Sequence, residues 1–297
     1  MKPVTHDDEQ LYREVRPHLF SIAYRMVGSV SEAEDIVQEA YLRFERAVQG
    51  GARVDAPRGY LVSIATRLAI DHLRSARLRR ESYVGTWLPE PVLAQPNPGD
   101  RAEVVDTLSM AFLVLLETLS PVERAVFLLR EVFGYGYDEI ADIVDRSEPN
   151  CRQIFARARG HVEAGRPRFT TSPEQRDAIV RSFLAACDEG DVDGLVRLLA
   201  DDVTFYGDGG GKAASVPRPV HGRDRVGRLL KTLLDRARHL DLQLSPATVN
   251  GQPGVLAWDG HGRLVNVVAL DIRDGAIVAF WATANPDKLR HLEPSGG

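Results

Sequence analysis

Proline sets the main division of this chain. Pro89, Pro91, Pro96 and Pro98 fall within ten residues of one another. A proline ring removes a backbone donor and fixes φ, so a stretch this rich in proline holds neither a helix nor a central strand. The sequence therefore predicts a linker at residues 86–106, between parts of the chain that fold separately.

A second break lies at residues 165–173, which contain one glycine and two prolines. Stretches of this composition mark loops between folded segments. At 297 residues, the chain is also too long for one compact domain. We expect three folded segments, at residues 1–85, 107–164 and 172–292, of which the first two are all-α and the third is α+β.

Composition excludes several classes of protein. No apolar run is longer than the seven residues of Ala276–Ala282, which is far short of a membrane span. The N-terminal residues lack the apolar core of a secretory signal. Two cysteines, Cys151 and Cys187, cannot build a disulfide framework or a four-thiolate zinc site, and the eight histidines lack paired ligand spacing. We expect a cytoplasmic protein with no metal site, no cofactor and no membrane partner.

The first segment has the apolar spacing of helices. Apolar residues recur at intervals of three and four between Leu19 and Met26. Ser31, followed three residues later by Glu34, predicts a capping box at the start of a second helix. A third helix is predicted at residues 57–80.

The second segment ends in a helix-turn-helix pattern. A short helix is predicted at Tyr137–Val144, followed by a turn at residues 145–147 and a further helix that Ser147 can cap. The outer face of the last helix carries polar side chains of the types that bond base edges in the major groove: Asn150, Arg152, Gln153, Arg157 and His161. A short helix, a tight turn and a polar second helix are typical of a DNA-binding motif.

Positive charge is concentrated in two stretches of a chain whose net charge is −5. Residues 67–80 hold five arginines and one aspartate, and residues 146–168 hold six arginines and two glutamates. Stripes of this kind fit surfaces that meet phosphate. On charge alone, two solvated helix faces explain them equally well.

The third segment mixes helices and strands. Helices are expected at residues 174–189, 192–200 and 222–238, and strands at residues 203–206, 255–258, 264–272 and 276–283. Asp274-Gly275, between the last two strands, is a strong signal for a two-residue hairpin. This order predicts an α+β domain with helices wrapped on a curved antiparallel sheet.

These segments resemble a known family. Residues 31–40 (SEAEDIVQEA), 60–74 (YLVSIATRLAIDHLR) and 119–130 (LSPVERAVFLLR) are similar to regions two and four of the sigma-70 family, in its compact extracytoplasmic-function form. The third segment is similar to SnoaL-like domains of the cone-shaped nuclear-transport-factor-two-like fold. Three short motifs resemble markers of the subgroup that carries such a domain at its C-terminus: Trp87–Pro91 (WLPEP), Asp208–Lys212 (DGGGK) and Asn285–Leu289 (NPDKL).

The resemblance implies a transcription initiation factor, not an enzyme, whose partners are core RNA polymerase and promoter DNA. It implies that the exposed helix face of Asp35, Gln38 and Glu39 contacts core RNA polymerase. It assigns the minus-ten promoter element to Tyr60, Arg67, Arg74 and Arg77. It assigns the reading of the minus-thirty-five element to Arg152, Gln153 and Arg157, with Asn150 near a phosphate.

The resemblance also implies that the fused domain regulates the sigma domains through intramolecular contact. The expected contact residues are Trp87, Pro89, Pro91, Asp208, Gly209, Gly210, Gly211, Lys212, Asn285, Asp287 and Lys288. A loop of three glycines allows the close approach of another backbone, and the apolar, aromatic linker is the surface we expect it to meet. The alternative is a flexible surface loop beside an inert spacer.

Two other functions stay open for the third segment, a polyketide-cyclase-like or isomerase-like enzyme and a small-ligand sensor. Tyr206, Asp208, His221 and Asp259 can supply polar groups to a cavity of that kind. The Gly-rich loop itself is not a phosphate-binding P-loop, because Ala213 stands where Ser or Thr would hold magnesium.

Overall fold

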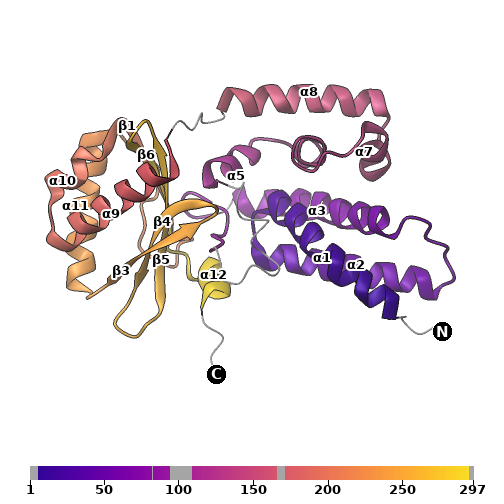
Figure 1. Cartoon of the computed structure of the whole chain (residues 1–297), viewed down its shortest axis with the longest axis horizontal. Helices are drawn as coiled ribbons and strands as arrows, with labels where there is room; N and C mark the ends of the chain where they lie inside the picture. Colours follow the sequence, from indigo (N-terminus) through magenta and orange to yellow (C-terminus); the bar gives the residue numbers. More distant parts are fainter. Residues whose placement is uncertain (1–5, 82, 94–108, 166–170, 294–297) are drawn as a thin grey trace. The chain divides into compact units, whose positions relative to one another are not determined.

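The structure, a computed structural model, describes residues 6–81, 83–93, 109–165 and 171–293. The chain divides into two compact units, residues 1–81 with 112–166 and residues 82–111 with 167–297. The first unit is helical, and the second combines helices with one sheet. The predicted fold class is therefore confirmed (Figure 1).

The first unit begins with three helices that pack on one another, α1 (His6–Val27), α2 (Val30–Gln49) and α3 (Pro57–Glu81). It continues with α5 (Met110–Leu116, which starts in the second unit), α6 (Pro121–Phe127), η1 (Leu128–Val132), α7 (Tyr137–Val144) and α8 (Glu148–Gly165). Tyr24, Leu61 and Leu128 are among the largest side chains that are fully buried. The apolar stripes of these helices thus form the core that the spacing predicts.

The start of α2 differs from the sequence prediction. Gly28 ends α1 with φ 73°, and Ser29 follows directly as the N-cap, with its hydroxyl accepting from the Glu32 amide at 3.3 Å. Ser31 was expected at this position, and that expectation is wrong. A glycine with positive φ turns the chain within one residue, so the helix starts earlier than the Ser31–Glu34 pattern indicates.

The helix-turn-helix is present as expected, with one irregularity before it. α7 ends at Asp145, which takes the left-handed conformation with φ 54°, and α8 follows three residues later. Between α6 and α7, the residues of η1 form a π-helical turn, in which the Phe133 amide donates to the Leu128 carbonyl at 3.1 Å. π-helical turns are rare and occur often at functional sites.

The second unit is built on a six-stranded sheet with the order β2-β1-β6-β5-β4-β3. The strands are β1 (Leu199–Asp208), β2 (Val220–His221), β3 (Gln243–Val249), β4 (Gln252–Trp258), β5 (Leu264–Arg273) and β6 (Ala276–Thr283). The helices are α9 (Pro173–Glu189), α10 (Val192–Arg197), α11 (Arg223–His239) and α12 (Pro286–Leu289), followed by the short η2 (Arg290–Leu292). β1 pairs with β6 in parallel, and the other pairs are antiparallel.

The two faces of this sheet differ in what covers them. α9, α10 and α11 pack on one face, where Phe183 and Phe205 contact the ring of Phe280 at centroid distances of 5.9 and 5.6 Å (Figure 1). Because side chains alternate along a strand, Tyr206 and Asp208 point from β1 to the opposite face. That second face carries the polar residues used by the linker.

β3 was not expected from the sequence. It pairs with β4 through a hairpin in which Asn250 and Gly251 take φ 50° and 68°. Pro246 lies within β3, which is the last strand of the sheet order, and an edge strand tolerates the missing donor.

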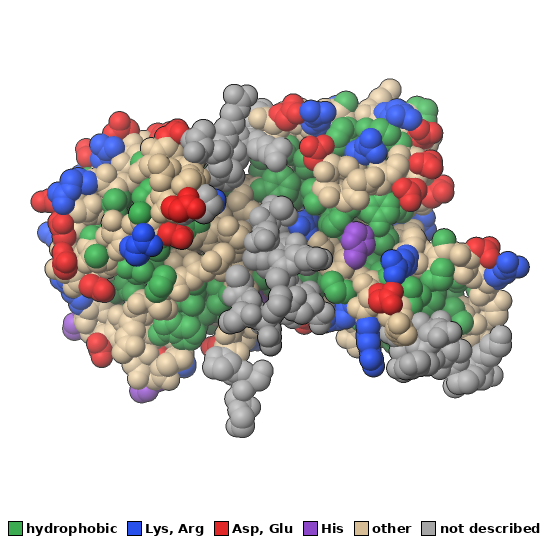
Figure 2. Space-filling view, in the orientation of Figure 1, with side chains coloured by type: hydrophobic (Ala, Val, Ile, Leu, Met, Phe, Trp, Pro, Cys, Tyr) green, Lys and Arg blue, Asp and Glu red, His purple; other side chains and the backbone are tan. Residues whose placement is uncertain are grey.

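Charged side chains of both signs are interspersed on the face of the molecule seen in Figure 2. Within the described ranges, no helix is both long enough and apolar enough to cross a membrane.

Candidate functional site

The second helix of the helix-turn-helix, α8, presents a polar face and buries the other. Cys151, Ile154 and Ala158 are buried, and they fix which side of the helix faces outward. The four side chains assigned to the minus-thirty-five element are all exposed: Asn150, Arg152, Gln153 and Arg157. A row of donors and acceptors on an exposed helix after a tight turn can enter a major groove.

Arg152 is held in place more firmly than its neighbours on α8. Its guanidinium forms an ion pair with Glu148, one turn earlier, and stacks over the Tyr137 ring with Cζ 4.5 Å from the centroid. On the same ring lies Arg130, at 4.8 Å. Tyr137 could not be singled out as a contact of Arg152 from local patterns, because only the fold brings these three residues together.

The residues assigned to the minus-ten element lie along α3. Tyr60 is 39% exposed and lies 6.3 Å from the Phe44 ring. Arg74 is exposed and pairs with Asp71 at 3.1 Å. The side chain of Arg77 lies outside the described residues. Tyr60 and Arg74 are thus open to a strand of DNA.

Arg67 differs from Tyr60 and Arg74 because it donates to the backbone of α7 through two of its five N–H groups. Its Nε donates to the Ile143 carbonyl at 2.9 Å and its Nη2 to the Asp142 carbonyl at 2.6 Å. Both carbonyls belong to the last turn of the first helix of the helix-turn-helix, where a helix attracts cations. Within the first unit, α3 and the helix-turn-helix therefore hold each other through a residue assigned to DNA.

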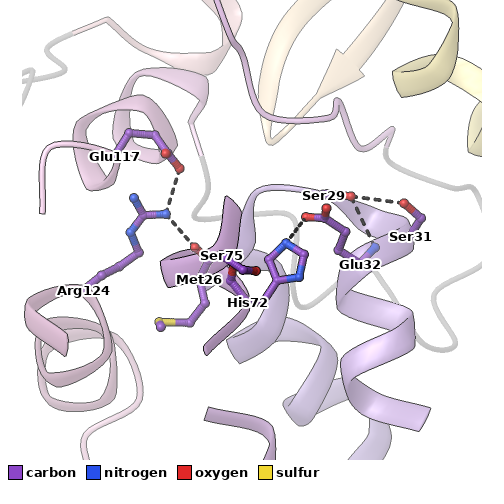
Figure 3. Close-up of polar contacts among 8 residues, drawn as sticks. All are labelled: Met26, Ser29, Ser31, Glu32, His72, Ser75, Glu117 and Arg124. Atoms are coloured by element: carbon purple, nitrogen blue, oxygen red, sulfur yellow. Dashed lines mark hydrogen bonds and ion pairs between the residues drawn. The ribbon is translucent and has the colours of Figure 1, made fainter. Parts of the chain in front are cut away.

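Arg124 makes a second connection inside this unit (Figure 3). It is 3% exposed, and its Nη1 donates to the Met26 carbonyl at the end of α1 and to Glu117, which lies 2.7 Å away. Burial lowers the pKa of this guanidinium to about 9, which leaves it charged at neutral pH. A buried charge needs partners of this kind, so Arg124 ties α6 to α1.

A histidine contact adds to the same junction. The ring of His18 in α1 is bonded to the Tyr135 hydroxyl at 2.9 Å, and burial, followed by the charges of Arg25 and Arg58, lowers the pKa of His18. In the same view as Arg124, Figure 3 shows His72 of α3 beside Glu32 of α2, with Nε2 and Oε2 2.8 Å apart.

The face assigned to core RNA polymerase lies on α2. Asp35 and Gln38 are exposed, whereas Ile36 and Val37 between them are buried. Glu39 is half-buried, and its hydrogen bond with Arg43 at 2.7 Å lowers the pKa of the carboxyl. The carboxylate of Asp35 thus faces outward, while that of Glu39 is already paired within its own helix.

Asp208, at the end of β1, is the centre of a buried polar cluster in the second unit. Its side chain is fully buried. The carboxylate accepts from the Tyr83 hydroxyl, from the Leu88 amide at 2.8 Å and from the Lys288 ammonium at 2.7 Å. Leu88 belongs to the linker, Tyr83 lies just before it and Lys288 belongs to α12, so a single carboxylate joins the end of β1 to two segments that are distant in sequence.

Lys288 completes the cluster. It is 7% exposed and lies over the rings of Trp87 at 4.1 Å and Tyr83 at 5.1 Å, and it also donates to the Leu88 carbonyl. Asn285 caps α12 and donates from its amide to the Tyr83 hydroxyl at 2.9 Å. Burial, followed by the hydrogen bond to Asp208 and its charge, raises the pKa of Tyr83, which therefore stays a donor.

The glycine loop leaves room for the linker. Gly210 and Gly211 take φ 58° and 71°. A Cβ at Gly210 would overlap the side-chain amide of Asn285, and one at Gly211 would lie 3.3 Å from Val84. Beside this loop, Lys212 pairs with Asp287, which lowers the pKa of that carboxyl. Glycine is thus required by close approach as well as by φ.

The linker is also bonded to the second unit at Pro91 and Val92. The amide and carbonyl of Val92 bond to the side chain and amide of Asn250 at 3.0 and 2.8 Å, and His291 bonds to the Pro91 carbonyl at 2.8 Å. The Met110 amide donates to Gln252 at 2.7 Å. Leu88, Pro89, Glu90, Pro91 and Val92 are all buried. Residues 94–106 of the predicted linker lie outside the described residues.

Sequence reasoning missed four residues of this contact: Tyr83, Asn250, Gln252 and His291. Asn250 had a usable signal, because Asn-Gly between two apolar runs indicates a hairpin. The other three carry no local signal. Their role depends on where the linker lies on the sheet.

The polar residues considered for an enzyme cavity do not meet in one. Tyr206 stacks on Trp281 at 4.2 Å, on the sheet face opposite the apolar core. His221 is exposed and bonded to Thr204 at 3.0 Å, and Asp259 accepts from backbone and side chain of Arg263 in a turn. The space between helices and sheet is instead filled by hydrocarbon, including Phe280.

Comparisons with known proteins identify the segments. Three family models match, Sigma-70 region 2 at residues 11–79, Sigma-70, region 4 at residues 109–162 and SnoaL-like domain at residues 180–287. ECF RNA polymerase sigma factor SigJ of Mycobacterium tuberculosis is 38% identical to this chain, and the alignment covers 96% of each protein. The chain belongs to the ECF sigma factors.

Two further comparisons agree for the whole length of this ECF sigma factor. The probable ECF RNA polymerase sigma factor SigI of Mycobacterium tuberculosis is 36% identical over 96% of both chains. The crystal structure of Mycobacterium tuberculosis SigJ superposes with a TM-score of 0.75 at 36% identity, covering 94% of this chain and 97% of that one. The predicted family, with its fused SnoaL-like domain, is confirmed.

Proposed function

We propose that this ECF sigma factor binds core RNA polymerase and directs it to a subset of promoters in the cytoplasm. The observation that carries the proposal is the exposed row Asn150, Arg152, Gln153 and Arg157 on α8, the second helix of the helix-turn-helix. We assign this row to the minus-thirty-five element. We assign Tyr60, Arg67, Arg74 and Arg77 on α3 to the minus-ten element, and Asp35, Gln38 and Glu39 on α2 to core polymerase.

Contact of Arg67 with DNA is compatible with its bonds inside the first unit. Two of its five N–H groups donate to the carbonyls of Asp142 and Ile143. The side chain is exposed, and its three other N–H groups are the ones that we assign to a phosphate of the minus-ten element.

We further propose that the SnoaL-like domain controls this activity by holding the linker between the two sigma regions. Support comes from the buried ion pair of Asp208 with Lys288. Both residues of the pair bind Leu88 of the linker: Asp208 accepts from its amide, and Lys288 donates to its carbonyl. A linker whose residues Leu88 and Val92 are bonded to the SnoaL-like domain is restrained there, whereas a free one lets the sigma regions adopt the spacing of the promoter elements. Direct contact between the SnoaL-like domain and the sigma regions is part of the proposal.

We do not assign an enzymatic activity to the SnoaL-like domain. Asp208, which would be its general base, is fully buried and has its carboxylate bound to the linker and Lys288. A general base must reach a substrate proton, and this carboxylate faces away from the apolar core.

The test is transcription from a pool of duplexes with randomised promoter regions, using purified core RNA polymerase with and without the full chain. We expect transcripts from a subset of templates only when the chain is present. Arg152→Ala and Arg157→Ala are each expected to weaken promoter binding by about 1–3 kcal/mol if the side chain contacts a base. Absence of chain-dependent transcripts would contradict the proposal.

The polymerase face is tested separately by co-purification. Asp35→Ala with Gln38→Ala removes two exposed side chains without touching the core, so the fold is expected to persist while binding of core polymerase falls. Asp193→Ala, which removes an exposed acid from α10 of the other unit, is the matched control. Parental binding by the folded double variant would reject this face.

A further inference from the structure

Tyr137, the first residue of α7, lies at the junction of three elements of the helix-turn-helix. Arg130 comes to its ring from η1 and Arg152 from α8, with the two Cζ atoms 4.8 and 4.5 Å from the ring centroid. The Phe155 ring packs nearby at 6.1 Å and 73°, edge to face. Guanidinium groups at these distances are attracted by the ring electrons.

Hydrogen bonds fix the loop before Tyr137 and the first turn of its helix. Arg130 donates to the Tyr135 carbonyl at 2.9 Å, which closes the loop before α7. The Gly136 amide donates to Glu139 at 2.8 Å and fixes the first turn of the helix. Arg130 reaches this place from the π-helical turn at Leu128–Val132. The irregular turn thus ends in a contact with the tyrosine.

Arg152 gains a defined orientation from this ring. Its side chain is 57% exposed, and Glu148 is its only charged partner in the described part of the chain. A guanidinium whose face lies over a ring and whose Nη2 donates to one carboxylate still has other N–H groups on its edge, and such groups bond the O6 and N7 atoms of guanine. A flexible arginine would have to be ordered when it binds, whereas a stacked one is ordered beforehand.

We propose that Tyr137 is a positioning residue for base recognition, which sets the plane of the Arg152 guanidinium in the major groove. The inference rests on the proposed function, since it requires that α8 reads DNA. Tyr137 need not touch DNA, because it acts through Arg152. Arg130, on the same ring, restrains the tyrosine.

The experiment measures base discrimination by the full chain bound to core RNA polymerase. A duplex is first selected from a randomised pool, and each base pair of its upstream element is then substituted in turn. Arg152→Ala identifies the position read by Arg152, where discrimination is expected to fall by about tenfold or more. Tyr137→Leu is expected to lose much of the discrimination at that position and at no other, while Tyr137→Phe, which retains the ring, keeps it.

Two further variants separate positioning from a purely structural role. In the Arg152→Ala background, Tyr137→Leu is expected to change discrimination no further. Arg159→Ala removes a cation of the same helix that pairs with Glu163 at 2.6 Å, and it is expected to weaken all duplexes equally. Uniform weakening by Tyr137→Leu, or unchanged discrimination, would overturn the positioning role alone. Unchanged discrimination with Arg152→Ala would overturn the reading of DNA by Arg152, and with it the basis of the inference.

Discussion

Two buried aspartates on the same face of the sheet illustrate opposite ways of placing a carboxyl group. Asp208 accepts from three donors, one of them the cation of Lys288. Asp271 is 1% exposed, one of its oxygens has no partner among the described residues, and the nearest cation, Arg273, lies 3.8 Å away. The first carboxylate organises a contact, whereas the second weakens the fold in its charged form.

Replacing Asp208 by Asn is expected to release the linker. The change keeps the size of the side chain but leaves Lys288 buried without a negative partner. Removing one partner of a comparable buried ion pair lowers the free energy of unfolding by about 3–5 kcal/mol. Hydrogen exchange at the Leu88 amide, which donates to Asp208, measures the release directly. Asp287→Asn breaks the exposed pair with Lys212 and should change exchange at Leu88 little, because such pairs contribute about 0–1 kcal/mol. Unchanged protection of Leu88 in Asp208→Asn would contradict this role.

Replacing Asp271 by Asn is expected to stabilise the second unit at neutral pH. Burial raises the pKa of this carboxyl, an effect that Arg273 partly offsets. Because the folded pKa exceeds the unfolded value of about 3.9, the parent loses stability as pH rises between the two values, and the loss is complete above the folded pKa. The advantage of the variant should therefore be present at pH 7 and vanish near pH 3.

Urea unfolding followed by tryptophan fluorescence checks this difference, since all three tryptophans, Trp87, Trp258 and Trp281, belong to the second unit. An advantage of Asp271→Asn that is equal at both pH values would show that the carboxyl is not the cause.

At the scale of elements, local sequence patterns predicted those turns and helices whose structure depends on neighbouring residues. The Asp274-Gly275 hairpin and the helix Tyr137–Val144 form where their patterns place them, with Asp274 and Gly275 at φ 50° and 77°. β3 was missed because Pro246 argues against a strand unless the strand is known to lie at the sheet edge. The contact of Asp208 with Lys288 spans 80 residues, and no local pattern specifies such a pairing. The three family motifs predicted that these segments contact one another, and the structure shows which atoms bond.

The glycine loop after β1 gives a prediction at this scale. Gly210→Ala places a methyl group against the Asn285 amide and also requires φ 58°, so we expect the linker to leave the sheet. Gly262→Ala is the matched control, because Gly262 has φ 75° but nothing within 4 Å of the added Cβ. The control should lower the free energy of unfolding only by the cost of a positive φ at alanine, about 1–2 kcal/mol. Chymotrypsin, which cleaves after aromatic residues such as Trp87, should cut the linker faster in Gly210→Ala alone, and equal cleavage rates would refute the steric argument.

For the molecule as a whole, the linker connects α3 to α5 and thus connects the two sigma regions. The second unit binds it near Leu88 through Asp208 and near Val92 through Asn250. Inside the first unit, Arg67 holds α3 against α7. Under the proposed function, the contacts with the linker restrain the placement of the two regions on two promoter elements, so breaking the contacts made by the C-terminal residues should favour initiation.

The C-terminal tail offers the sharpest test of this restraint. Residues 285–297 follow the last strand and include Lys288 and His291, which bond to the linker, and Asn285, which bonds to Tyr83 just before it. A chain that ends at Ala284 keeps the sheet but lacks these contacts, and we expect it to initiate more transcription than the full chain. The gain should be about tenfold for each 1.4 kcal/mol that the tail contributes to linker binding. Lys288→Met, which keeps an apolar side chain of similar length but removes the charge, should also raise transcription above that of the full chain.

Removal of the whole SnoaL-like domain, residues 171–297, is expected to have the opposite effect. The run Leu88–Val92, which is buried in the full chain, would then be exposed, and its bonds to Asn250 and Asp208 would have no replacement. Exposed apolar linkers collapse on themselves or aggregate, so the spacing of the sigma regions is lost and transcription should fall below that of the full chain. Single-round transcription with core polymerase at matched protein concentrations compares the three lengths. Equal transcription by all three chains would leave the SnoaL-like domain without a regulatory role. A domain that both restrains and supports the sigma regions requires more transcription from the chain that ends at residue 284 than from the full chain, and less from the chain that ends at residue 170.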